Sequence, residues 1–128
     1  MVFQFRDTEP EMLARLDSEL KALVAEANLG PCEVNLISTG TTAPAAMDGR
    51  FQDALEAAAA IHVPGGFQRM PSGAGHDAQI LAGIMPSAML FVPSIGGISH
   101  HYAEDTSDAD LVLGCQVFVD AAAALLAG

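Results

Sequence analysis

The chain has 128 residues, a hydrophobic content of 51%, and 5 Lys and Arg against 16 Asp and Glu. The length suits one packed domain, and the apolar content excludes a disordered chain. The acidic balance argues against a nucleic-acid partner, because phosphate backbones are bound by basic surfaces.

The sequence carries no sign of export or of a membrane span. No basic leader precedes an apolar segment at the start, and the most apolar stretch, residues 111–127, is interrupted by Gln116 and Asp120. We therefore expect no membrane partner and a cytoplasmic location. Two cysteines, Cys32 and Cys115, are too few for a disulfide framework or a cysteine-based zinc site. We expect both to be buried as small apolar side chains.

The first 38 residues predict a β-α-β unit. Residues 2–6 and 33–38 alternate between apolar and polar side chains, as strands do. Between them, Asp7 or Thr8 is expected to cap a helix that carries Pro10 in its first turn. One apolar stripe at helical spacing lies along this helix, formed by Leu13, Leu16, Leu20, Leu23, Val24 and Ala27. Gly30 and Pro31 end it.

The remainder predicts helices and strands in alternation. The polar segment 39–46 is the expected crossing between two domains. Asp48 is expected to cap a helix, residues 67–70 to be extended, and residues 77–84 to form a short helix. Residues 88–92 are apolar on both faces, as in a central strand. Ser107 opens a final helix, so the fold class is α/β or α+β, in the order β-α-β, linker, α-β-α-β-α.

The candidate site lies between residues 72 and 104, where glycine-rich turns present histidines and acids. Ser72 to Gly75 precede a helix and would offer backbone N–H groups to an anion, but no Walker motif follows. His100 comes after an apolar strand and a glycine turn, where α/β folds carry chemistry. A neutral imidazole can bind zinc, and Glu104 could orient or join it. The set is incomplete, because a catalytic zinc usually takes three protein ligands.

Arg6, at the end of the first predicted strand, has two interpretations. It could form a surface ion pair with Asp7 or Glu9, which would contribute little to stability. It could equally offer its guanidinium fork to a carboxylate. Sequence spacing leaves both open.

Three motifs carry a resemblance to a known family. Met70–Gln79 (MPSGAGHDAQ), Phe91–Ser94 (FVPS) and Gly96–His100 (GGISH), followed by Ala103-Glu104, resemble the C-terminal signature of the M20-type dinuclear-metal amidohydrolases. The most similar branch contains N-carbamoyl-L-amino-acid hydrolase, allantoate amidohydrolase and β-ureidopropionase. Phe3–Asp7 also resembles a strand of that family's lid, or dimerisation, domain. The resemblance covers essentially the whole chain. It implies half of a lid domain in residues 1–43 and the C-terminal part of the catalytic domain in residues 44–128.

The resemblance also implies an activity and roles for individual residues. The family hydrolyses C–N bonds of linear amides and ureido acids with water activated between two divalent metal ions, commonly zinc or manganese. His100 corresponds to the last metal ligand, and Glu104 to an acid that supports it. Arg6 corresponds to a lid arginine that grips the substrate carboxylate. The loop that lines the substrate pocket corresponds to Gly73, Ala74, Gly75 and His76. The other metal ligands and the general base have no counterpart here, so no catalytic residue is assigned.

Three hypotheses follow. In the first, the chain begins within the lid and is an inactive C-terminal piece, whose partners are an N-terminal metal-binding half and a small ureido or amide substrate. In the second, it is a non-catalytic module that self-associates as a homo-oligomer, because an open strand edge and unpartnered helices favour pairing. In the third, a new mononuclear metal site forms from His76, Asp77, His100, His101 and Glu104.

Overall fold

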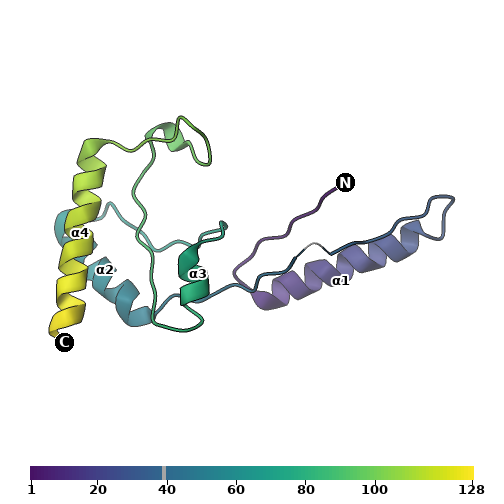
Figure 1. The fold of residues 1–128 in the computed structure, drawn as a ribbon, viewed down its shortest axis with the longest axis horizontal. Helices are drawn as coiled ribbons and strands as arrows, with labels where there is room; N and C mark the ends of the chain where they lie inside the picture. Colours follow the sequence, from purple (N-terminus) through teal and green to yellow (C-terminus); the bar gives the residue numbers. More distant parts are fainter. Residues whose placement is uncertain (39) are drawn as a thin grey trace. The chain divides into compact units, whose positions relative to one another are not determined.

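The computed structural model describes residues 1–38 and 40–128, and its regular elements are helices (Figure 1). They are α1 (Pro10–Ala27), α2 (Gly49–His62), α3 (Asp77–Leu81), the short 3-10 helix η1 (Ile95–Gly97) and α4 (Asp108–Ala127). The chain divides into two compact units. Unit 1 contains Met1–Ala45 and Pro71–Gly75, and unit 2 contains Ala46–Met70 and His76–Gly128.

In unit 1, α1 begins later than its predicted caps. Glu9 occupies the N-cap, and Pro10 takes the first helical position, where its missing N–H costs nothing. Asp7 lies outside the helix, and its carboxylate accepts a hydrogen bond from the Glu9 N–H at 2.8 Å. The prediction of Asp7 or Thr8 as cap is therefore wrong, because Asp7 closes a turn ahead of the helix.

The far end of α1 leads into a turn held by one side chain. The Asn28 amide donates to the Val34 carbonyl at 2.9 Å and accepts from the Val34 N–H at 2.7 Å. The predicted apolar stripe is narrower than expected, because Leu23 and Ala27 are exposed. The half-buried part of the stripe consists of Leu13, Leu16, Leu20 and Val24.

In unit 2, α2 packs against α4, and both helices begin at the predicted caps. The Asp48 carboxylate accepts from the Phe51 N–H at 3.0 Å, and the Ser107 hydroxyl accepts from the Asp110 N–H at 3.1 Å. Each cap satisfies a helix N–H group that lacks an internal partner. Within the described residues, the buried core lies where these helices meet and consists of Ala58, Ala59, Val117 and Ala121.

The four predicted strands are not found among the described residues. Residues 2–6, 33–38, 67–70 and 88–92 carry no strand assignment. A strand is defined by backbone hydrogen bonds to a neighbour, and alternating side chains alone do not supply that neighbour. The predicted α/β arrangement is therefore not confirmed, whereas its helices are present. Of the predicted domain crossing at 39–46, Thr39 lies outside the described residues, and residues 40–46 contain no helix or strand.

The expectation that both cysteines are buried is corrected. Cys32 and Cys115 are both exposed, because neither lies within the small contact between α2 and α4. In the part of the chain that the structure describes, α4 is the one helix long and apolar enough to cross a membrane. It has 20 residues and a mean hydropathy of 1.7, and 11% of its apolar 18-residue stretch is buried. A single helix of this kind is weak evidence for a membrane span, because core helices of soluble proteins meet the same criteria.

Gly114 allows α4 to approach Val92 closely. A Cβ atom at Gly114 would overlap Cγ1 of Val92. We expect Gly114→Ala to lower the free energy of unfolding by about 1–2 kcal/mol, the usual cost of overpacking. In a Val92→Ala background the obstacle is gone, and the same change should stabilise the protein by about 1 kcal/mol through helix propensity. Urea unfolding of the unaltered chain, the two single variants and the double variant measures the coupling free energy between Gly114 and Val92. Changes in the free energy of unfolding that simply add would contradict the contact.

Candidate active-site wall

Arg6 and the glycine-rich loop come together within unit 1. The Arg6 guanidinium donates through Nη1 to the Gly73 carbonyl at 2.6 Å and through Nη2 to the Gln4 side-chain oxygen at 3.0 Å. Two residues separated by 67 positions in the sequence thus share one charge-assisted hydrogen bond. The alternative of a surface pair with Asp7 or Glu9 is not what the structure shows. The guanidinium is instead positioned beside the loop that the resemblance assigns to the substrate pocket.

The loop itself is short, and one hydrogen bond within it is described. The Ala74 N–H donates to the Ser72 hydroxyl at 3.3 Å, and Gly73 and Gly75 are not among the described glycines with positive φ. A Cβ at Gly75 would meet nothing within 4 Å, and one at Gly73 would only reach ordinary contact with the Arg6 side chain. Neither the backbone conformation nor the space around these positions therefore requires glycine at Gly73 or Gly75. α3, which follows the loop, has 5 residues and makes no substantial anion site by itself.

His76 belongs to unit 2 and occupies the N-cap position of α3. Its ring packs against Phe91, with the ring centroids 5.5 Å apart and the planes at 59°. This tilted geometry is a favourable arrangement for two rings. The predicted pocket residue His76 is therefore oriented by an aromatic side chain from the apolar segment 88–92.

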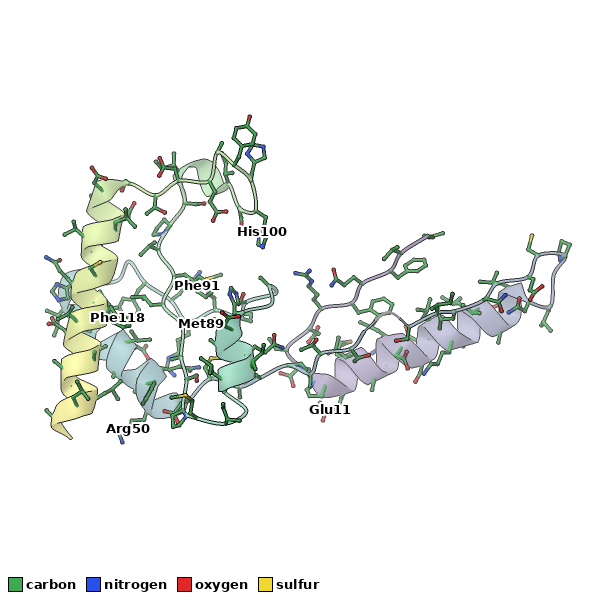
Figure 2. All side chains as sticks on the ribbon, viewed as in Figure 1. Glu11, Arg50, Met89, Phe91, His100 and Phe118 are labelled. Carbon is green, nitrogen blue, oxygen red and sulfur yellow. The ribbon has the colours of Figure 1, made fainter. Side chains whose placement is uncertain are left out.

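His100 lies in a tight turn that follows η1. Its φ of 56° is the one positive value at a described non-glycine residue, and Gly96 and Gly97 also have positive φ. Histidine tolerates this left-handed conformation better than most residues, yet it remains uncommon. The Glu104 carboxylate accepts from the His100 backbone N–H at 2.7 Å and so holds the turn closed. Figure 2 shows His100 at the outer end of this turn.

The His100 ring is oriented by a second hydrogen bond. The Ser99 hydroxyl lies 2.8 Å from Nδ1 of His100. A hydrogen bond at Nδ1 leaves Nε2 as the nitrogen that can bind a metal, as in many metal-binding histidines. Glu104 therefore acts on the backbone of His100, whereas Ser99, which the sequence reasoning missed, acts on its ring. A hydroxyl directly before the histidine was the available signal.

The described residues do not form a metal site. No group of three or more His, Cys, Asp or Glu side chains in residues 1–38 and 40–128 is arranged to hold an ion. The hypothesis of a mononuclear site built from His76, Asp77, His100, His101 and Glu104 is thus not supported. His101 forms contacts within its own turn. Its Nδ1 accepts a hydrogen bond from the Ala103 N–H at 3.1 Å, and the centroid of its ring lies 4.2 Å from that of Tyr102.

Two polar clusters in unit 2 were not predicted. Arg69 donates to Glu56 at 2.8 Å and also bonds Asp53, so it fastens residues 67–70 to α2. These hydrogen bonds, to Asp53 first and then to Glu56, raise the pKa of Arg69 above its usual value. Because the pKa of Arg69 is raised in the folded protein, this contribution to stability is present at neutral pH and is lost as the pH rises through the raised value. His62 pairs with Asp120 of α4 at 2.6 Å.

Comparison with known proteins identifies the family of this chain. The model of peptidase family M20/M25/M40 matches residues 6–124. The chain belongs to this family. Allantoate amidohydrolase from Escherichia coli (strain K12) is 56% identical over 48 residues, which are 38% of this chain and 12% of that protein. N-carbamoyl-L-amino-acid amidohydrolase from Rhizobium meliloti is 30% identical over 110 residues, covering 86% of this chain and 26% of that protein.

A solved structure of a similar protein supports the fold. The crystal structure of an amidase of the hydantoinase/carbamoylase family from Burkholderia phymatum superposes with a TM-score of 0.83 and 41% sequence identity, covering 93% of this chain and 28% of that one. The chain therefore matches between 12% and 28% of the length of these relatives. The resemblance drawn from the glycine motifs is confirmed at the level of the family.

Proposed function

We propose that the chain is the C-terminal part of a metal-dependent amidohydrolase that cleaves C–N bonds of linear amides such as N-carbamoyl amino acids or allantoate. The observation that carries this proposal is the His100 turn, in which Ser99 and Glu104 present one imidazole for a metal. The names of the similar proteins, allantoate amidohydrolase and N-carbamoyl-L-amino-acid amidohydrolase, support the substrate class. One ligand cannot hold a dinuclear centre, so the chain is inactive without the rest of the enzyme.

The proposed roles divide between binding and metal support. When bound, a pair of divalent ions such as zinc or manganese lowers the pKa of a bound water and supplies the nucleophile. His100 would provide one ligand through Nε2, with its turn held by Glu104. Arg6 would offer its remaining N–H groups to the substrate carboxylate, while its hydrogen bond to Gly73 fixes its direction. Ala74 and Gly75, in the same unit as Arg6, would continue the pocket wall.

We test this proposal with a hybrid amidase, in which this chain replaces the 28% of the Burkholderia phymatum amidase that it matches. The hybrid is expected to release the free amino acid from an N-carbamoyl amino acid, and to lose this activity when a chelator removes its metal. An equal rate with allantoate would widen the substrate class without changing the reaction type. A folded, metal-loaded hybrid that cleaves neither compound would overturn the proposal. Fractionation of cells that produce this chain, followed by its detection in each fraction, would separately test the proposed cytoplasmic location.

Arg6 gives a prediction that separates binding from metal chemistry. In the hybrid, Arg6→Ala is expected to raise KM by about 10–100-fold, in line with the loss of a charged hydrogen bond worth about 1.5–3 kcal/mol. Arg6→Lys should recover little of this, because an ammonium lacks the planar fork. Metal content should stay unchanged, since Arg6 does not bind the ion. Steady-state kinetics on an N-carbamoyl amino acid, with Arg15→Ala as a surface control, measures the effect. An unchanged KM would remove Arg6 from the substrate site.

A further inference from the structure

Gln4 contacts the same guanidinium that binds the glycine-rich loop. Its side-chain oxygen accepts from Nη2 of Arg6 at 3.0 Å, while the Gly73 carbonyl accepts from Nη1 at 2.6 Å. All three residues belong to unit 1. The two acceptors hold different terminal nitrogens, so together they fix both the position of the guanidinium and the orientation of its plane. Each terminal nitrogen keeps a second N–H group, which can serve a ligand.

Both of these acceptors are electrically neutral. A peptide carbonyl and a side-chain amide orient Arg6 through their dipoles, but neither cancels its positive charge. The adjacent carboxylate, that of Asp7, accepts instead from the Glu9 N–H at 2.8 Å in the turn before α1. Arg6 is thus oriented by groups that leave its charge for an anion.

Arg69 shows the opposite arrangement in unit 2. Its guanidinium bonds the carboxylates of Asp53 and Glu56 as well as the Gln52 side-chain oxygen, which accepts from Nη1 at 3.2 Å. Carboxylates suit an arginine that fastens one segment to another, because they orient and neutralise it at once. A carboxylate beside Arg6 would compete with any anionic ligand for the same charge. The amide of Gln4 avoids this competition.

We infer that Gln4 is a positioning residue that sets substrate specificity, because it orients Arg6 without neutralising it. The consequence is selection of substrates that carry a carboxylate over neutral analogues in which an amide replaces that carboxylate. The inference rests on the proposed function, and it adds to it a residue that acts through Arg6 and a reason for an amide at position 4.

Gln4→Glu in the hybrid amidase tests the inference, because it keeps the length and an acceptor oxygen but adds a negative charge. We measure kcat and KM for an N-carbamoyl amino acid and for its α-carboxamide. The ratio of kcat/KM between acid and amide should fall about 10-fold, from the added charge next to Arg6. The change should lie in KM for the acid, with kcat within about two-fold. Gln4 is exposed, so the melting temperature should hold.

Gln4→Met separates orientation from charge. It keeps the length of the side chain but removes the amide oxygen, so KM for the acid should rise about 3–10-fold, as for the loss of one hydrogen bond. In an Arg6→Ala background the same change should have no effect on KM, because Gln4 acts through Arg6. Gln52→Glu is the matched control. It makes the same chemical change at a glutamine that accepts from Arg69, and should leave the acid-to-amide ratio unchanged.

The outcomes distinguish this inference from the proposed function. A folded, metal-loaded hybrid with the unaltered chain that cleaves neither an N-carbamoyl amino acid nor allantoate contradicts the function. An active hybrid that cleaves acid and amide equally well contradicts the inferred selectivity alone. The role of Gln4 is also overturned if Gln4→Glu leaves the acid-to-amide ratio unchanged, as it would if kcat/KM fell equally for both substrates. A full effect of Gln4→Met in the Arg6→Ala background would show that Gln4 does not act through Arg6.

Discussion

Replacing His100 with alanine in the hybrid amidase is expected to lower kcat/KM for an N-carbamoyl amino acid by more than about 100-fold. Even the loss of a residue that supports a metal ligand costs about 10–100-fold, and the loss of the ligand itself removes a bond to the ion. The expectation follows from the proposed role of Nε2, because the Ser99 hydroxyl lies 2.8 Å from Nδ1 of His100 and so occupies the other ring nitrogen. Metal content, measured by mass spectrometry on the purified protein, should fall in parallel.

His101→Ala provides the matched control. It removes an adjacent imidazole whose Nδ1 already accepts from the Ala103 N–H at 3.1 Å. We expect activity within a few-fold of the unaltered hybrid, and unchanged metal content. Equal losses from both substitutions would indicate that the turn had merely been disrupted. Full activity and full metal content in the His100→Ala protein would contradict the assignment of His100 as a ligand.

The largest effect on stability is expected from Val117→Asp. Val117 is 3% exposed and packs between α4 and α2 in the small core of unit 2. A carboxylate there would be buried without a partner, which costs about 3–5 kcal/mol. Because the rest of this core is alanine, no larger apolar contact offsets the loss. Urea unfolding of the isolated chain, followed by circular dichroism, should show loss of the helical pair.

Val119→Asp in the isolated chain is the control for this prediction. It makes the same chemical change two residues along α4, on a side chain that is 61% exposed. We expect a change within about 0.5 kcal/mol, as for most surface substitutions. Equal destabilisation by the two variants would contradict the packing of α4 on α2 through Val117.

The helices of this protein can be predicted from sequence because their signals are local. Asp48 and Ser107 each bond an N–H group three residues ahead, so a short window of sequence contains the whole cap. The α1 start shows the limit, since Asp7 forms a similar bond to Glu9 but closes a turn outside the helix. The strands could not be predicted reliably, because residues 88–92 have the side chains of a strand but no backbone hydrogen bond to another described residue.

In the candidate site, too, contacts between residues close in sequence could be predicted, whereas contacts between distant residues could not. Motif spacing identified His100, and the Ser99 and Glu104 contacts lie within four residues of it. The Arg6–Gly73 bond spans 67 positions, so sequence spacing left the role of Arg6 open. Arg69 was missed because its acceptors, Asp53 and Glu56, lie 16 and 13 residues earlier, on one face of α2. The resemblance supplied the long-range information that periodicity lacks.

The most direct test of the central proposal supplies the missing part of the enzyme in a separate polypeptide. The chain is coexpressed with the portion of the Burkholderia phymatum amidase that it does not cover, and the initial rate of N-carbamoyl amino acid hydrolysis is measured for the chain, the other portion and the pair. We expect metal-dependent hydrolysis by the pair and none by either piece alone. Hydrolysis by the chain alone, or a metal-loaded pair that releases no amino acid, would contradict the proposal.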